Sequence, residues 1–340
     1  MIQLYVATGD GLAVIRRKNA RWQAHLKMER LPTQCVAPDP LAPEMAYCGT
    51  FGEGLWRSRD AGISWEPVGE GIPHGEVMAV AVSPLERAAA GGLVWAGTEP
   101  SALFSSEDEG RAWKEWPALR GLPSASTWSF PPRPWTHHVR WIAPDSVAQR
   151  RLFVAIELGG VMRTLDGGET WEDRKPGSQA DAHTLATHPL APGRVYEAAG
   201  GGYAESRTGG VTWTSDDEGL SHSYLWGLAV DPGDPETVLV SAARGPVEAH
   251  HADGARSTIY RKARGSPWRE VRDGLPDPRG RRVITLAAHA AEPGVFYAAL
   301  QEGGLYRSAD AGRSWERVEV DWPDGYRYQH VHGLAAVELG

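Results

Sequence analysis

Histidines recur at one position of repeated strand-like segments in this chain. Counting six residues back from Pro144 and Pro189 gives His138 and His183, and the same register in the last apolar segment gives His332. If these segments surround a common axis, the three imidazoles could bind a zinc, copper or iron ion with an open coordination position. They could instead act as acid or base groups, or hydrogen-bond loop backbone. These three alternatives stay open, and the first implies a divalent transition metal as cofactor.

Two glutamates offer a second kind of chemistry. Glu99 in GTEPS and Glu157 in IELGG lie at nearly the same height, each in the loop that follows the second strand of a repeat. Paired carboxylates hydrolyse glycosidic bonds, with retention at separations of about 5 Å and inversion at about 6.5 to 9.5 Å. The catalytic candidates are therefore Glu157, Glu99 and His183. The alternative is that both glutamates are solvated charges at a rim.

Loops near these residues depart most from the repeat and are rich in aromatic residues. They are GLPSASTWSFPPRPWTHHVRW (121–141), ARGPVEAHHADGARSTIY (243–260) and DWPDGYRYQHVH (321–332). Loops on a rigid scaffold concentrate binding residues, and aromatic rings stack on flat ligands such as sugars. The ligand-binding candidates are two anion anchors, three stacking surfaces, a phenol and an imidazole: Arg140, Arg244, Trp128, Trp135, Trp226, Tyr203 and His137.

A repeated turn organises the elements that position these residues. Five segments share, with some decay, the frame Ser/Thr-x-Asp-x-Gly-x-Ser/Thr-Trp: SRDAGISW (58–65), SEDEGRAW (106–113), TLDGGETW (164–171), SRTGGVTW (206–213) and SADAGRSW (308–315). Two more segments fit the period and end at Trp22 and Trp268. The seven tryptophans are on average about 49 residues apart, which is typical of four-stranded propeller blades. We expect all seven in the core.

Each repeat predicts the same local structure. The Asp can accept backbone amides of its own turn, the Gly supplies a backbone angle that side chains resist, and the Trp covers the sheet with apolar surface. Around the turn we expect four strands, with a Pro-bearing turn between the first two. The final HVHGLAAVEL (330–339) is a first strand without the other three, whereas the N-terminus begins at a second strand. Joining the two ends in one sheet closes a ring and removes exposed sheet edges.

The sequence therefore predicts an all-β fold, a single seven-bladed β-propeller closed by its C-terminal strand in the N-terminal blade. The expected domain covers residues 1–340, with blades at 1–30 plus 330–339, 31–70, 75–118, 136–175, 181–216, 223–272 and 281–320.

The turns resemble the Asp-box (BNR) repeats of sialidases, sortilin, photosystem II assembly factors and xyloglucan-cleaving cellobiohydrolases, and the resemblance covers essentially the whole chain. GTEPSALFSSEDEGRAW (97–113) is also similar to small bacterial sialidase-like, glycosyl-hydrolase-like propellers. The resemblance implies that the boxes lie on the face away from the ligand site. IELGGVMRT (156–164) resembles the loop in which the xyloglucan-cleaving propellers keep a catalytic Asp, which casts Glu157 as an acid or base. This chain differs from the xyloglucan-cleaving family, because it has Glu where that loop has Asp and a single predicted propeller where that family has two. It also differs from true sialidases, because their Arg-bearing N-terminal motif is missing.

Composition limits the partners and the compartment. The net charge of −8 argues against nucleic acid, and the absence of a long apolar run argues against a membrane. Two cysteines, Cys35 and Cys48, are too few for a disulfide framework, and no leader pattern precedes the first strand, so we expect a cytoplasmic protein with buried thiols. The expected function is binding of a small molecule or carbohydrate in the axial funnel, with a leaning toward hydrolase chemistry. The alternatives are a metal-dependent enzyme that uses the three histidines and a non-catalytic scaffold with a protein partner.

Overall fold

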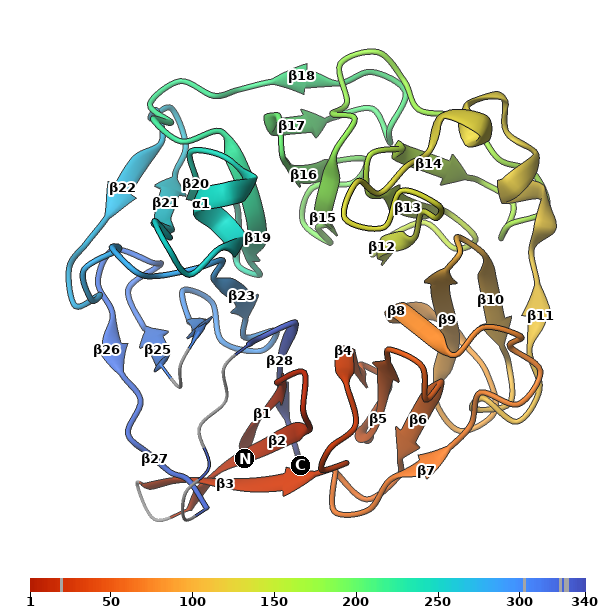
Figure 1. The fold of residues 1–340 in the computed structure, drawn as a ribbon, viewed down its shortest axis with the longest axis horizontal. Coiled ribbons are helices and arrows are strands. Elements are labelled where there is room, and N and C mark those ends of the chain that lie inside the picture. The colour runs from red at the N-terminus through yellow and green to blue at the C-terminus, as the bar shows by residue number, and fades with distance from the viewer. Residues whose placement is uncertain (19–20, 302–303, 324–325, 327–329) are drawn as a thin grey trace.

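The computed structural model describes residues 1–18, 21–301, 304–323, 326 and 330–340, and it forms a ring of seven antiparallel sheets around a central axis (Figure 1). The predicted seven-bladed, all-β propeller is thus confirmed. Residues 19–20 and 302–303, within the first and last predicted blades, lie outside the described residues. None of the helices among the described residues has the length and apolarity needed to span a membrane.

Blade 1 combines both ends of the chain: β1 (Ile2–Ala7), β2 (Leu12–Lys18), β3 (Arg21–Lys27), β27 (Val320–Asp321) and β28 (Gly333–Glu338). Blade 2 contains β4 (Thr33–Asp39), β5 (Ala42–Thr50), β6 (Leu55–Ser58) and β7 (Glu66–Pro67). Blade 3 contains β8 (Glu76–Arg87), β9 (Gly92–Glu99), β10 (Leu103–Ser106) and β11 (Lys114–Glu115). Blade 4 contains β12 (Val139–Pro144), β13 (Leu152–Ile156) and β14 (Gly160–Thr164). Blade 5 contains β15 (Ala182–Thr187), β16 (Val195–Ala199), β17 (Gly202–Ser206) and β18 (Thr214–Ser215). Blade 6 contains β19 (Tyr224–Asp231), β20 (Asp234–Ala243), β21 (Thr258–Lys262) and β22 (Arg269–Val271). Blade 7 contains β23 (Thr285–Ala288), β24 (Phe296–Leu300), β25 (Gly304–Ser308) and β26 (Glu316–Arg317).

The short helices whose bounds the structure describes lie in two connections. The 3-10 helices η1 (Pro117–Gly121) and η2 (Pro123–Thr127) link blades 3 and 4, and α1 (Pro246–His250) lies in blade 6 between β20 and β21. Blade 4 has three strands among its described residues, because the segment after its turn makes a single bridge, Arg163 with Glu172. The next two side chains bind to connecting segments instead of a fourth strand. Asp173 accepts the backbone N–H of Ser124, and Arg174 donates to the carbonyl of Gly159.

Ring closure follows the prediction. The C-terminal strand β28 pairs antiparallel with β1, with Tyr5 opposite Ala335, and the N-terminal amine of Met1 donates to the carbonyl of Leu339 over 2.6 Å. The innermost strand of each blade contacts that of the next, and β28 joins β23 to β4. In addition, β27 pairs in parallel with β3, so the chain that leaves blade 7 continues along the outer strand of blade 1.

The core consists of apolar clusters between neighbouring blades. Strand residues alternate between the two faces of a sheet, so successive residues pack against opposite neighbours. In β24, for example, Tyr297 and Ala299 pack against blade 1, whereas Phe296 and Ala298 pack against blade 6. Such burial on both faces explains why the inner strands are almost continuously apolar.

The repeated turn begins at the last residue of the third strand in five blades. In blade 4 the hydroxyl of Thr164 accepts the N–H of Gly168 at 2.9 Å, and Asp166 accepts both the N–H (2.9 Å) and the hydroxyl (2.5 Å) of Thr170. These bonds from Thr170 lower the pKa of Asp166 to about 2. The same two backbone bonds recur in the other four turns, with Thr208 in place of Asp in the turn of blade 5.

The seven repeat tryptophans divide into two groups. Those at 22, 213, 268 and 315 are buried, whereas Trp65, Trp113 and Trp171 are only half-buried, so the expectation that all seven lie in the core was partly wrong. Each of these three indoles donates its N–H to the glycine carbonyl of its own turn, but the buried Trp213 does the same, so this bond does not explain the difference.

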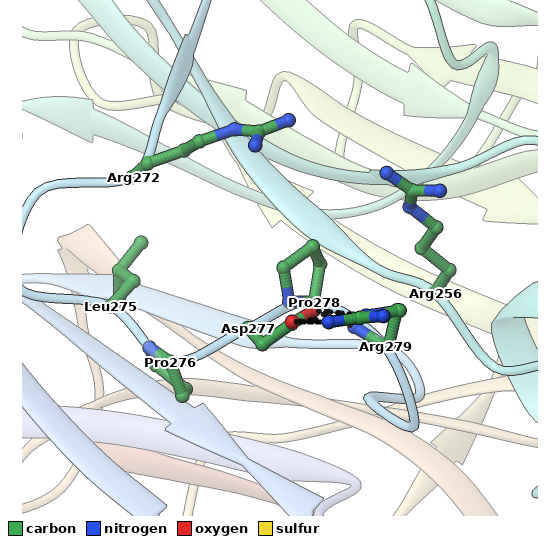
Figure 2. Close-up of a pocket in the computed structure, with 7 residues that line it drawn as sticks. All are labelled: Arg256, Arg272, Leu275, Pro276, Asp277, Pro278 and Arg279. Carbon is green, nitrogen blue, oxygen red and sulfur yellow. Dashed lines mark hydrogen bonds and ion pairs between the residues drawn. The ribbon is translucent and has the colours of Figure 1, made fainter.

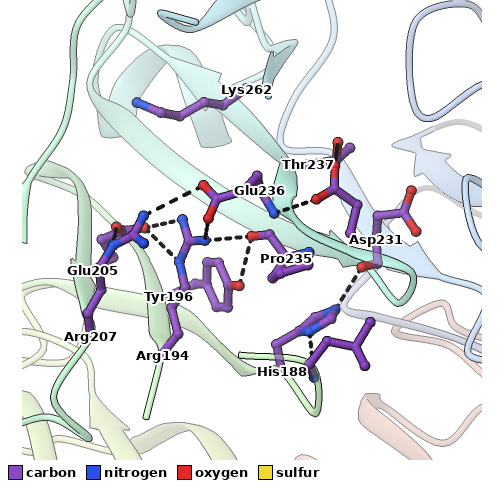
Figure 3. Close-up of polar contacts among 12 residues, drawn as sticks. His188, Arg194, Tyr196, Glu205, Arg207, Asp231, Pro235, Glu236, Thr237 and Lys262 are labelled. Atoms are coloured by element: carbon purple, nitrogen blue, oxygen red, sulfur yellow. Dashed lines mark hydrogen bonds and ion pairs between the residues drawn. The ribbon is translucent and has the colours of Figure 1, made fainter. Parts of the chain in front are cut away.

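A polar network lies between blades 5 and 6 (Figure 3). The guanidinium of Arg194 bridges Glu205 and Glu236, with N–O distances of 2.7 Å to each, and Tyr196 donates to the carbonyl of Pro235. Tyr203, which is fully buried, donates its hydroxyl to Glu205 at 3.0 Å. Because its charges are paired, this network stabilises the contact between the two blades.

Candidate functional site

All seven blades line one cavity of about 670 Å³ on the axis of the ring. We call it the axial cavity, and the residues that form its walls are Gln34, Met78, Phe130, Pro131, Pro132, Arg133, His138, Arg140, Glu157, Leu158, Asp181, Tyr224, Trp226, Pro246, His250, Arg282, Val283, Gln301, His330, Val331 and His332. Most come from the starts of the innermost strands or from the loop after β13. Because strands alternate in direction within a blade, the repeated turns after the third strands lie at the opposite end of the ring.

A chain of charged groups runs along one wall of the axial cavity. Arg133 holds both oxygens of Glu99 (2.6 and 2.5 Å), and the imidazole of His138 lies between the two predicted catalytic glutamates. Its Nδ1 is 3.5 Å from Glu99, and its Nε2 is 3.0 Å from Oε2 of Glu157. The two carboxylates therefore do not face a common open space. Instead, His138 links them, and its Nε2 is within hydrogen-bond distance of Glu157.

Glu157 is held as an anion. Burial favours its neutral form, but the hydrogen bond from His138 and the positive charge of the nearby Arg140 lower the pKa of Glu157 to about 2. Arg140 Nε lies 3.7 Å from Oε2 of Glu157, and the guanidinium also stacks over the ring of Trp226 at 4.4 Å. Glu157 can thus act as a hydrogen-bond acceptor, a base or a nucleophile at neutral pH.

The three predicted metal-binding histidines occupy different positions. His138 and His332 line the axial cavity, whereas His183 is fully buried beneath it. Among the described residues, the group with ligand atoms within 4.8 Å of one another is Glu157, Asp181 and His183, so the three imidazoles do not form a common ligand set.

Other histidines of the wall are neutral at physiological pH. Burial and the nearby His330 lower the pKa of His332 to about 4, and burial with the nearby His183 lowers the pKa of His250 to about 4. His250 accepts or donates a hydrogen bond with the hydroxyl of Tyr224 at 3.0 Å. These imidazoles can exchange hydrogen bonds with an uncharged ligand.

The remaining predicted ligand-binding residues are dispersed. Trp226 and Arg140 line the axial cavity, whereas Trp128 is buried, donates to Ser124 and contacts His137 edge to face. Trp135 is 80% exposed on the loop before β12, and Arg244 is exposed after β20. Tyr203 belongs to the network between blades 5 and 6. In the segment 321–332, residues 324–325 and 327–329 lie outside the described residues.

Sequence reasoning missed Asp181 and Tyr224, and it placed His250 in a rim loop without assigning it to the site. Asp181 directly precedes β15, two residues before His183, so the register that selected the histidines also places this carboxylate at the cavity. The signal was therefore present. His250 lies at the end of α1, a helix that the strand pattern does not predict.

A second cavity of about 420 Å³ lies in the connection from blade 6 to blade 7 (Figure 2). Three arginines contribute to it, but Arg279 pairs with Asp277 and Arg272 with Glu270, and both arginine side chains are largely exposed. In contrast to the axial cavity, this surface does not hold a buried reactive group. We therefore place the candidate site in the axial cavity.

No protein-family model matches the chain, and no curated protein matches it either. Solved structures match it in fold. An ancestral GH74 enzyme aligns over 98% of this chain with a TM-score of 0.64 and 15% identity, and a GH74 enzyme of Niastella koreensis aligns over 92% with a TM-score of 0.66 and 16% identity. YCF48 bound to a D1 peptide aligns over 85% of this chain and 83% of its own, with a TM-score of 0.58 and 18% identity.

These similarities establish the class of fold, a seven-bladed β-propeller, and nothing finer, because every identity is low. This chain spans only 40% and 52% of the lengths of the two GH74 enzymes.

Proposed function

We propose that the chain binds a small saccharide, of one or two rings, in the axial cavity. The observation that carries the proposal is the combination of an aromatic wall and an ionised carboxylate in one cavity of about 670 Å³, within the usual size range of small-molecule sites. Trp226 and Tyr224 offer apolar surface for the C–H face of a sugar. Glu157 and Asp181 accept hydrogen bonds from hydroxyl groups, and neutral His250 and His332 can donate or accept.

Hydrolysis of the bound saccharide is the catalytic extension of this proposal. Cleavage of a glycosidic bond needs a proton donor as well as a carboxylate. Since Arg133 engages Glu99 and Glu157 is ionised, the candidate for this donor is His138, whose Nε2 lies 3.0 Å from Glu157. The Glu99 and Glu157 pair predicted from the sequence does not supply a free carboxylic acid.

The test is calorimetric titration of the purified protein with a panel of mono- and disaccharides, followed by an assay for release of reducing ends. The Glu157→Gln variant keeps the shape of the side chain but removes its charge, so we expect at least a tenfold loss of affinity. The exposed Glu44, which is not part of the cavity wall, provides the matched control Glu44→Gln. Unchanged affinity in Glu157→Gln would contradict the proposal.

A protein partner is the second candidate, and one exposed aromatic residue favours it. Trp135, 80% exposed, lies on the loop whose Pro131, Pro132 and Arg133 line the axial cavity. Exposed tryptophans are enriched where proteins bind one another. The solved structure of YCF48 with a D1 peptide makes peptide ligands the class to test. Binding of fluorescent peptides that Trp135→Ala weakens, with saccharides inert, would favour this candidate.

A further inference from the structure

Three potential metal ligands, two buried and one half-buried, join blades 4 and 5 beside the axial cavity. Glu157 follows β13, Asp181 precedes β15, and His183 lies within β15. One ligand atom from each lies within 4.8 Å of the other two. Clusters of acidic residues alone do not define a metal site, so the orientation of the imidazole decides the matter.

His183 presents an unpaired nitrogen to the two carboxylates. Its Nδ1 lies 2.6 Å from the backbone carbonyl of Leu225 and therefore carries the ring proton. Its Nε2 then has a lone pair, is buried and has no hydrogen-bond partner; the nearest charged atom is Oδ1 of Asp181 at 3.4 Å. A lone pair facing a carboxylate is repulsive unless a cation lies between them. Metal-bound histidines commonly donate their other N–H to a backbone carbonyl in this manner.

The spacing fits a small cation. Two ligands bound tetrahedrally to zinc at about 2.0 to 2.1 Å are roughly 3.4 Å apart, which matches the separation of Nε2 of His183 and Oδ1 of Asp181. The contacts of His138 and Arg140 with Glu157 are both made at Oε2, so Oε1 can serve as the third ligand. Metal binding would require the Glu157 side chain to rotate so that its ligand atom, within 4.8 Å of the other two, approaches the ion.

The backbone around Asp181 is adapted to hold this carboxylate. The N–H of Gly200 donates to the Asp181 carbonyl, and a Cβ atom at Gly200 would lie 2.0 Å from Oδ2 of Asp181. Any other residue at position 200 would displace the carboxylate. Glycine thus leaves the space that Asp181 needs beside His183.

We propose that Glu157, Asp181 and His183 bind one divalent transition-metal ion, best met by Zn²⁺, with its open coordination position toward the axial cavity. One imidazole and two carboxylates suit this class of ion, and three protein ligands with an open position are typical of zinc sites that bind a further ligand. The site goes beyond the saccharide binding proposed above and does not depend on it. It also differs from the three-histidine set predicted from the sequence.

The experiment uses the full chain, freed of metal by chelation and titrated with Zn²⁺ by calorimetry and with Co²⁺ by visible absorption. We expect one ion per chain and d–d bands of a site with nitrogen and oxygen ligands. His183→Gln and Asp181→Asn should each weaken Zn²⁺ binding at least tenfold, and the exposed His25→Gln should not. Asp181→Asn is nearly isosteric, so it still tests the proposal if His183→Gln does not fold.

Two outcomes would overturn the site. One is that the folded wild-type protein binds no Zn²⁺, or that the Asp181→Asn variant binds Zn²⁺ as tightly as wild type does. The other is His332→Gln losing Zn²⁺ while Asp181→Asn retains it, which would assign the ion to the histidines instead. Zinc is measured without saccharide, so failure of the metal site and failure of saccharide binding remain distinguishable.

Discussion

The two ends of the propeller treat polar side chains in opposite ways. At the end with the repeated turns, each Ser, Thr or Asp is hydrogen-bonded within its own eight residues, as Asp166 is to Thr170. At the axial cavity, buried polar atoms are left without hydrogen bonds, including Nδ1 of His138 and Nε2 of His183. Buried polar groups without partners cost stability. The hydroxyl and carboxylate groups of the repeated turns are therefore saturated, whereas the axial cavity keeps buried polar atoms that a ligand could engage. Unpaired buried atoms also occur within the blades, as at Nε1 of Trp315.

Adding a side chain at Gly168 should destabilise the end with the repeated turns most strongly. This residue has a φ of 97°, and a Cβ atom there would lie 2.8 Å from the indole of Trp116 in blade 3. We expect Gly168→Ala to lower the free energy of unfolding by about 2 to 4 kcal/mol, because backbone strain adds to the steric clash. Chemical denaturation measures the loss. Saccharide or zinc affinity in the folded variant should stay within twofold of wild type, and a larger change would show that the two ends are coupled.

Two tryptophans at opposite ends give a matched pair of variants. Trp226 lines the axial cavity under Arg140, whereas Trp65 packs against Tyr5 beside its turn. We expect Trp226→Ala to weaken saccharide binding at least tenfold, which corresponds to about 1.4 kcal/mol, because the stacking surface is lost. Trp65→Ala should lower the melting temperature and leave affinity unchanged. The reverse pattern in calorimetry and thermal denaturation would refute the division between the ends.

Glu197 sharpens the comparison, because it is a buried acid outside both regions. It lies in β16 with no exposed surface, and its oxygens accept the N–H of Gln179 at 3.1 and 3.2 Å. Burial raises the pKa of Glu197 to about 8, against the opposing hydrogen bond from Gln179. The folded state therefore keeps a proton that the unfolded chain releases above about pH 4.5, and stability falls as the pH rises from about 5 to 8.

Glu197→Gln mimics the protonated acid and should remove this slope, which amounts to at most about 1.4 kcal/mol per pH unit. Urea denaturation at pH 5.5 and pH 7.5 measures it. We expect the variant to gain more stability relative to wild type at pH 7.5 than at pH 5.5. A parallel shift at both pH values would mean that Glu197 is not protonated in the folded protein.

The fold could be predicted from the sequence because its signals are local. A turn such as 164–171 carries within eight residues the groups that bond one another, and its repetition reports the number of blades. The incomplete repeats at the two ends of the chain indicate that these ends combine in one blade and close the ring. The half-buried position of Trp171 was not predicted, because Trp171 and the buried Trp213 share the same kind of turn and the same indole hydrogen bond, so the repeat does not encode which of them is more exposed.

Residues of the site could be predicted only where the register of a strand determines whether a side chain faces the axial cavity. Counting back from Pro144 selects His138, which does line the axial cavity. Contacts between blades are not encoded in any single repeat, so the approach of Asp181 to Glu157 and the capture of Glu99 by Arg133 could not be read from spacing. Tyr203 shows the converse, since its side chain points into the network between blades, and alternation along β17 does not distinguish that face from a rim.

The pairing of β1 with β28 has a consequence for how this chain can be rebuilt. Because Met1 and Leu339 meet within one sheet, a short linker could connect the two termini and the polypeptide could be reopened at an exposed turn of another blade. Such a circular permutant would keep every strand pair while placing the covalent break elsewhere. A comparison of its unfolding with that of wild type would report how much the closure of blade 1 by two separate chain ends limits the stability of the ring.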